Sequence, residues 1–171
     1  MDVQPGIVER IEAKDSYLKK LNKLIDRAHL SEIMVIFVVV GFRPGFPEIS
    51  STNKSFADVK RSYRESMITP VPAIQLQEQD ILVTKHRVSA FSGSDLEMIL
   101  NANHVNHLIL TGIATSGVVL STLREAADKD YQLTVVEDLC VDFDPDIQQL
   151  LINKLFPRQA NIVSSDSLSF D

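Results

Sequence analysis

Charged and small polar residues follow directly after apolar stretches of this sequence, at positions where parallel strands place ligand-binding groups. Lys85 ends the run "DILVTK", and His86 and Arg87 come next. The small-residue turn at 112–117 ends the run "HLIL" and leads into a helical pattern. Desolvation or a nearby carboxylate would fix the charge and orientation of a lysine in such a place. The backbone N–H groups of the turn can hold an anion or an oxyanion. The simpler alternatives are a lysine that reaches solvent and an ordinary capped turn.

Apolar runs that alternate with amphipathic segments must position these groups. We predict strands at 33–40, 80–85, 107–113, 133–138 and 160–165, the last at a sheet edge. We predict one or two helical segments within 6–29, and helices at 94–103, 116–130 and 144–156. This alternation indicates an α/β fold of three layers, α/β/α, with a mostly parallel central sheet. The proline-rich stretch 41–80 is expected to be a long, ordered loop of functional importance.

Ligands of such sheets bind outside the carboxyl ends of the strands. The candidate segments are therefore Gly41 to Pro47, Lys85 to Arg87, Thr111 to Gly117, and Glu137 with Asp138. Within them, Arg43 and Arg87 could clamp a substrate carboxylate, because guanidinium binds carboxylates in a bidentate manner. Phe46 could form an apolar wall of the pocket. An exposed arginine and a core aromatic residue remain the structural alternatives.

The length, composition and charge of the chain limit the classes of protein to which it can belong. With 171 residues, of which 44% are hydrophobic, the chain can bury one core, so we expect a single domain over residues 1–171. The net charge of −6 argues against nucleic-acid binding. The longest strongly apolar run is far shorter than the roughly 20 residues of a membrane span, so no membrane association is expected. A single cysteine, Cys140, and the lack of a secretory signal favour a reducing, cytoplasmic location.

Three segments, taken in order, resemble the isochorismatase-like hydrolases, also called the cysteine hydrolase family. They are "MDVQPGIV", "VTKHRVSAFSGSDLEMIL" and "TGIATSGVVLSTLREAADKDYQLTVVEDLCVD". The resemblance covers nearly the whole chain. It implies a Rossmann-like topology, a small-molecule substrate and a homo-oligomer, either a dimer or a tetramer.

The family's catalytic triad consists of an Asp, a Lys and a Cys. In the matched segments Asp2 stands at the position of the Asp, Lys85 at that of the Lys, and Val118 at that of the nucleophilic Cys. Valine cannot attack a substrate. Cys140 does not replace the thiol, because it lies a helix and a strand later in the chain, where a small buried apolar residue is expected.

The resemblance also implies that the turn before Val118 holds the substrate. Its residues are Ile113, Ala114, Thr115, Ser116 and Gly117. The bond between Ile113 and Ala114 matches the family's non-proline cis peptide.

The absent thiol leaves two explanations. In the first, the protein is a hydrolase that needs no protein nucleophile, like the family's isochorismatases, which cleave a vinyl ether with water. Asp2 is then the general acid or base, and Lys85 stabilises negative charge. Those enzymes have Gly where Val118 stands, so the pocket is narrower here. In the second, the chain has lost the chemistry and kept a binding or structural role; we favour the first because both charged partners are present.

No metal and no other cofactor are expected. The nicotinamidases of this superfamily bind a metal through an Asp-x-His-x-His cluster, whereas the segment "GFRPGFPEISS" contains no histidine. The four histidines of the chain show no paired ligand spacing.

The start of the sequence departs from the family pattern. About five apolar residues precede the catalytic Asp in the family and form a central strand, whereas Met1 stands directly before Asp2 here. The first strand is therefore expected to be missing or truncated, which leaves buried backbone groups without partners. We expect either that the natural reading frame begins upstream, or that residues 1–5 are loosely held and Asp2 is displaced.

Overall fold

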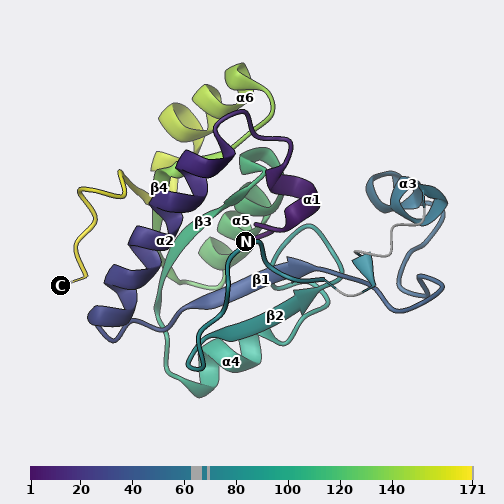
Figure 1. The fold of residues 1–171 in the computed structure, drawn as a ribbon, viewed down its shortest axis with the longest axis horizontal. Coiled ribbons are helices and arrows are strands. Elements are labelled where there is room, and N and C mark those ends of the chain that lie inside the picture. The colour runs from purple at the N-terminus through teal and green to yellow at the C-terminus, as the bar shows by residue number, and fades with distance from the viewer. Residues whose placement is uncertain (63–66, 69, 171) are drawn as a thin grey trace.

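The structure is a computed structural model that describes residues 1–62, 67–68 and 70–170 (Figure 1). Residues 63–66 and 69, within the stretch predicted as a loop, and residue 171, the last of the predicted domain, lie outside the described residues. Helices and parallel strands alternate along the chain, which confirms the predicted α/β class.

Every strand pair in the described part of the chain is parallel. The strands are β1 (Ile36–Val40), β2 (Ile81–Lys85), β3 (His107–Ile113), β4 (Gln132–Val141) and β5 (Asn161–Val163). They form two ladders, β1-β2 and β3-β4-β5, with β5 at the predicted edge position. The β-branched residues of β1 and β4 suit strands that are covered on both faces.

The helices lie on both faces of these ladders, as a three-layer fold requires. They are α1 (Pro5–Val8), α2 (Lys14–Leu30), α3 (Lys54–Ser62), α4 (Leu96–Ala102), α5 (Leu120–Asp128) and α6 (Pro145–Leu150). A π-helical turn, η2 (Thr115–Val119), precedes α5, while η3 (Leu151–Leu155) and the short η4 (Phe156–Arg158) follow α6. None of the described helices has the length and apolar character of a membrane span.

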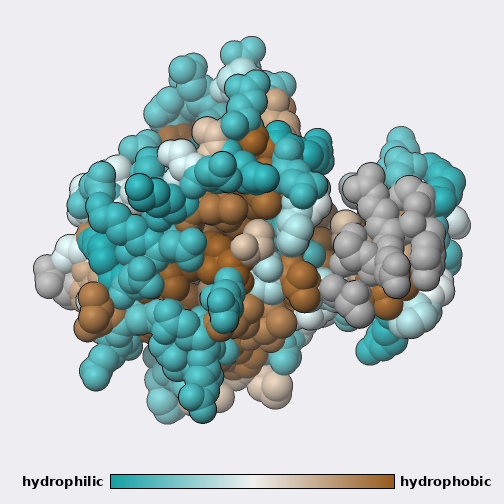
Figure 2. All heavy atoms as spheres, in the orientation of Figure 1, coloured by the Kyte–Doolittle hydropathy of each residue, from teal (hydrophilic) through white to brown (hydrophobic). Residues whose placement is uncertain are grey.

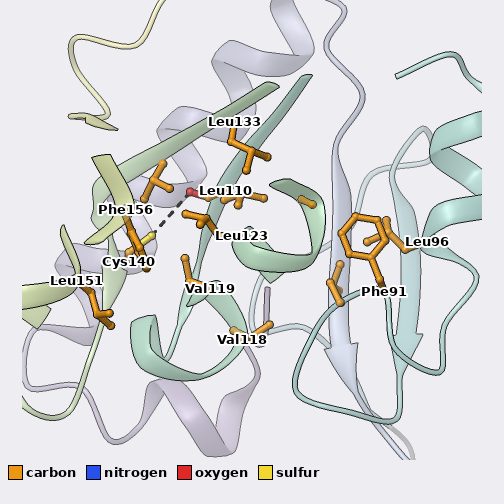
Figure 3. Close-up of a cluster of buried hydrophobic side chains, with 14 of the residues drawn as sticks. Phe91, Leu96, Leu110, Val118, Val119, Leu123, Leu133, Cys140, Leu151 and Phe156 are labelled. Carbon is orange, nitrogen blue, oxygen red and sulfur yellow. Dashed lines mark hydrogen bonds between the residues drawn. The ribbon is translucent and has the colours of Figure 1, made fainter. Parts of the chain in front are cut away.

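Two apolar cores lie between the layers of the fold. One lies between the strands and the helices α4 and α5, and it contains Leu96, Leu110 and Leu123 (Figure 3). The other contains Tyr17 and Leu21 of α2, which runs across the opposite face of the strands (Figure 1).

Helix α3 corrects the prediction that 41–80 is a loop throughout. It lies beyond the carboxyl ends of β1 and β2 (Figure 1). Its Phe56 packs with Phe42 and Phe46 in a third, smaller cluster. The prolines of 41–80 indicated a loop, and the few apolar residues of α3 give no clear helical period. The helix is stabilised instead by the packing of Phe56 against the loop residues Phe42 and Phe46.

The N-terminus lies between the two ladders. The amino group of Met1 donates a hydrogen bond to the Thr111 carbonyl at 3.0 Å, and the Ile113 N–H donates to the Met1 carbonyl at 3.2 Å. The Asp2 N–H donates to the Val38 carbonyl at 2.8 Å. The expectation that residues 1–5 are loosely held and Asp2 displaced is therefore wrong, because hydrogen bonds to both ladders fix this segment.

Candidate active site

Asp2 and Lys85 form a buried ion pair. Lys85 is the last residue of β2, and its Nζ lies 3.0 Å from Oδ2 of Asp2. The two residues are 7% and 1% exposed, respectively. Lys85 Nζ also donates to the Arg87 carbonyl at 2.9 Å, whereas Oδ1 of Asp2 is buried without a hydrogen-bond partner. Among the described residues, one carboxyl oxygen of Asp2 is therefore engaged by no hydrogen-bond donor.

The backbone around Asp2 explains how the chain holds it there. Met1 lies directly against Gly112, where a Cβ would come within 2.6 Å of the Met1 carbonyl oxygen, so no larger residue fits. Asp2 itself has a φ of 55°, a left-handed conformation that aspartate tolerates better than most residues. The side-chain amide of Gln4 then pairs with the backbone of Val40, as a residue of a neighbouring strand would. Its Oε1 accepts from the Val40 N–H at 2.9 Å, and its Nε2 donates to the Val40 carbonyl at 3.2 Å.

Burial determines the electrostatics of this pair. It raises the pKa of Asp2 above the usual aspartate value, although the neighbouring Lys85 ammonium opposes the shift. A carboxyl with a raised pKa is suited to act as a general acid.

The turn predicted to hold the substrate lies at the end of β3. Ile113 and Thr115 are fully buried, the bond between Ile113 and Ala114 is cis, and Oγ1 of Thr115 has no hydrogen-bond partner. The Ser116 N–H, however, donates to Oδ2 of Asp142 at 2.6 Å. Burial raises the pKa of Asp142, but hydrogen bonds from Ser116, Asp144 and Phe143 together outweigh burial and hold that pKa below its usual value. An internal carboxylate therefore occupies part of the predicted anion cradle.

Asp142 was not identified as a site residue from the sequence, because the end of the strand before it was placed at residue 138. The run at 133–138 suggested Glu137 and Asp138 as the strand-end residues, whereas β4 continues to Val141. Asp138 instead binds Ser165 and Lys20 on another part of the surface. The apolar residues Leu139 to Val141 were the available signal that the strand continues.

The two candidate arginine clamps are engaged elsewhere. Arg43 is largely exposed and pairs with Glu48, while Arg87 donates to the backbone carbonyls of His86 and Glu48. Phe46 is buried in the cluster beneath α3.

A surface hollow lined by Arg43 lies on the other side of β2 from the ion pair. Its other lining residues include Leu82, Thr84 and His86. These alternate with Lys85 along the strand and therefore project from the opposite face. The structure thus brings Asp2 and Lys85 together and leaves Arg43 apart from them.

Val118 and Cys140 are both core residues. Val118, in η2, is 2% exposed and packs in the cluster shown in Figure 3. Cys140 is buried in the same cluster, and its Sγ donates to the Leu110 carbonyl at 3.8 Å. Burial raises the pKa of the Cys140 thiol to about 12, so it is not a thiolate nucleophile near neutral pH. Within residues 1–62, 67–68 and 70–170, no group of three or more His, Cys, Asp or Glu side chains is placed to hold a metal ion.

Comparisons with known proteins show the family of the chain. The family model described as "Isochorismatase domain" matches residues 1–167. The isochorismatase family protein YwoC of Bacillus subtilis is 30% identical over 159 residues, which cover 92% of this chain and 84% of YwoC. Ureidoacrylate amidohydrolase RutB of Yersinia enterocolitica is 30% identical over 155 residues, which cover 81% of this chain and 67% of RutB. Among solved structures, an isochorismatase family protein from Burkholderia thailandensis superimposes with a TM-score of 0.82 at 27% identity, covering 96% of this chain and 88% of that protein.

Proposed function

The chain belongs to the isochorismatase family of hydrolases, and from this premise we propose that it hydrolyses a small molecule without a protein nucleophile, with Asp2 and Lys85 assisting the attack of water. The observation that carries the proposal is the buried pair of Lys85 Nζ and Asp2 Oδ2 at 3.0 Å, in which Oδ1 of Asp2 is buried without a hydrogen-bond partner. The same proposal includes a dimer or tetramer and a cytoplasmic location.

A vinyl ether is the bond type that this pair fits best. The protonated Asp2 carboxyl donates its proton to the terminal alkene carbon, which leaves an oxocarbenium ion. Water adds to this cation, the Asp2 carboxylate takes a proton from that water, and the resulting hemiketal collapses to a ketone and an alcohol. Lys85 holds the carboxylate in position and stabilises its charge when the proton has left. A related C–O or C–N bond, such as the amide bond that RutB's name indicates, is the next candidate class.

The alternative is a family member without catalysis, and two observations favour it. Val118, which the resemblance places at the position of the family's nucleophile, is a buried core residue, and Asp142 already binds the Ser116 N–H of the turn. Such a protein would bind a small molecule, or serve a structural role, and would turn over no substrate.

The first test is Asp2→Asn, assayed on vinyl ethers, amides and carbamoyl compounds. The asparagine keeps the shape of the side chain and an oxygen for Lys85 but carries no acidic proton. We expect turnover to fall by about 100-fold or more while the circular dichroism spectrum is kept. Asp138→Asn is the matched control, because Asp138 belongs to a different ion pair, and it should leave turnover unchanged. Absence of turnover by the unmodified protein on all three classes would favour the non-catalytic alternative.

The second test is Val118→Cys, which restores a thiol at the family's nucleophile position. If the remaining machinery is intact, this variant gains amidase activity that an alkylating reagent abolishes. Val119→Cys is the matched control, since it introduces the same thiol into the same turn at another buried position. Equal amidase activity of the two variants would contradict the idea that the surroundings of residue 118 activate a thiol there. Both variants keep Cys140, so any reaction of that thiol is the same in both.

A further inference from the structure

Strand β2 has one side with which no other described strand pairs. Residues 1–2 bind to both β1 and β3, which makes β2 and β5 the outermost strands. Among the described residues, β2 pairs with β1 alone. Figure 2 shows apolar side chains at the surface in the part of this face where Figure 1 places β1 and β2. We call the free side of Ile81–Lys85 the β2 edge.

Alternate residues direct their main-chain groups outward from the β2 edge. The Ile81 N–H donates to the Val35 carbonyl at 3.1 Å, so the odd-numbered residues of β2 face β1. Leu82 and Thr84 therefore direct their N–H and C=O groups away from β1. Within the part of the chain that the structure describes, no hydrogen bond reaches these outward groups. The β2 edge thus offers two donors and two acceptors to another strand.

The space beside the β2 edge is open. The hollow described above has a volume of about 540 Å³, and it is lined by Leu82 and Thr84 of β2, by Arg43 and His86, and by residues 93–95. Leu82 is 43% exposed, whereas leucine side chains are mostly buried in folded proteins. An extended segment therefore has room to lie along this edge, and it would cover an apolar side chain there.

The two outer strands differ in how they are protected against pairing with another chain. Strand edges pair readily unless they are short, are bulged, or carry proline or exposed charged residues. β5 (Asn161–Val163) has only three residues, and the Ser165 N–H after it donates to Asp138. β2 has five residues, no proline and an unbroken register with β1. Its one charged residue, Lys85, is buried in the ion pair with Asp2, so nothing on the β2 edge opposes pairing.

Charge at the two ends of β2 selects the direction of a partner strand. Glu78 is exposed and stands three residues before β2. Arg43 is exposed and lines the hollow with His86, which follows the other end of β2. A second copy that pairs through the same edge runs antiparallel, because both copies are related by a two-fold axis. Its acidic end then lies beside the basic end of the first copy, so the two ends attract each other.

We propose that two copies of this chain associate through the β2 edge, an inference that rests on the dimer or tetramer of the proposed function. Leu82 of each copy exchanges main-chain hydrogen bonds with Thr84 of the partner subunit, about a two-fold axis at Val83. The exposed Leu82 side chain lies beside Thr84 of the partner subunit on the same face of the joined sheet. Glu78 of each copy lies near Arg43 of the partner subunit.

The proposal is tested by the mass of the assembly, measured by analytical ultracentrifugation over a range of protein concentrations. We expect self-association with a Kd on the order of 10 µM, because an interface on one strand edge is small. Thr84→Pro removes an N–H group that β1 does not use, so it should keep the fold and weaken association about tenfold. Leu82→Lys places a charge on the edge and should weaken association by a similar factor. Leu30→Lys is the matched control, because it changes an exposed leucine of α2, and it should leave association unchanged.

A charge exchange tests the antiparallel arrangement. Glu78→Arg and Arg43→Glu, each alone, bring like charges together at both ends of the interface, and each should weaken self-association about tenfold. An equimolar mixture of the two variants should associate as well as the unmodified protein, because the two substituted positions then face each other with opposite charges. Circular dichroism of each variant checks that the fold is kept, since Arg43 also pairs with Glu48 within the chain.

The possible failures are distinguishable. An unmodified protein that stays monomeric at millimolar concentration overturns both the proposed oligomer and this interface. An assembly whose mass Thr84→Pro and Leu82→Lys leave unchanged overturns the interface alone, as does equal weakening by Leu30→Lys or a charge-exchange mixture that stays dissociated. If the protein is a tetramer, the two edge variants should halve its mass. None of these measurements uses turnover, so a failure here is separate from a failure of the hydrolase proposal.

Discussion

Lys85→Ala should lower the free energy of unfolding by about 3–5 kcal/mol, measured by urea denaturation at neutral pH. The Lys85 side chain is the cationic partner of Asp2, and both residues are more than nine-tenths buried. Removing the ammonium leaves a carboxylate in an apolar environment with its oxygens unpaired, and this penalty is larger than the net stabilisation that the intact pair provides. Any hydrolase activity should be lost with the pair.

Two further variants separate this cause from a loss of packing. Lys129→Ala removes a lysine from the ion pair with Glu97 at the surface, and it should change stability little because that pair is exposed and screened by solvent. Asp2→Asn combined with Lys85→Ala should recover much of the lost stability, since no buried charge remains. If the double variant is as unstable as Lys85→Ala alone, the buried carboxylate is not the cause.

The contribution of Asp2 to the free energy of unfolding depends on pH in a direction that its pKa shift determines. Burial raises the pKa of Asp2 in the folded protein, so the folded state binds this proton more tightly than the unfolded state does. The contribution of Asp2 to stability is then fully present below its unfolded pKa and is lost as pH rises through its folded pKa. In Lys85→Ala the opposing charge is gone, so this loss should extend to higher pH than in the unmodified protein.

The sequence was sufficient to predict the strand that carries Lys85. Lys85 follows a short apolar run that is typical of a strand, and the order of strands and helices implied that the carboxyl end of this strand meets those of the neighbouring strands. The resemblance in the segment "MDVQPGIV" identified Asp2, which no periodicity could have done. Their separation in the structure, 3.0 Å between Nζ and Oδ2, agrees with that pairing.

The parts that the sequence did not predict depend on tertiary contacts. Arg43 and Arg87 stand at strand ends, but nearby acceptors, the Glu48 side chain and backbone carbonyls, bind them first. Asp142 reaches Ser116 across 26 positions of the chain, and a strand boundary misplaced by three residues concealed it. Boundaries are poorly determined by local pattern because strand length is set by the neighbouring strand.

The N-terminal segment connects the two halves of the molecule at one end. Met1, Asp2 and Gln4 bind to β3 and β1 near the carboxyl ends of those strands, where the ion pair also lies. Farther back, a cavity of about 320 Å³ is lined by residues of the same two strands. The hydrogen bonds of residues 1–4 to both strands therefore hold the ion pair in place. The stability of the fold should be sensitive to any backbone that is added before Met1.

Adding five apolar residues before Met1 should raise Tm by about 10 °C, measured by differential scanning calorimetry. The added backbone continues the parallel bridge that Met1 makes opposite Gly112 and pairs with both strand edges. It also converts the buried Met1 amino group, whose pKa burial lowers, into an uncharged amide. A rise of this size corresponds to about 3–4 kcal/mol for a chain of this length, a few hydrogen bonds and buried side chains beyond the entropy of ordering five residues.

The matched control is an extension of five glycine and serine residues. It adds the same length of chain and the same amide at Met1, but it offers no apolar side chains to Leu100 and Val38 and loses more entropy on ordering. We expect it to raise Tm by less than half as much as the apolar extension. Equal Tm values for the two extensions would show that apolar side chains before Met1 do not pack between β1 and β3, whereas a rise limited to the apolar extension would show that they do.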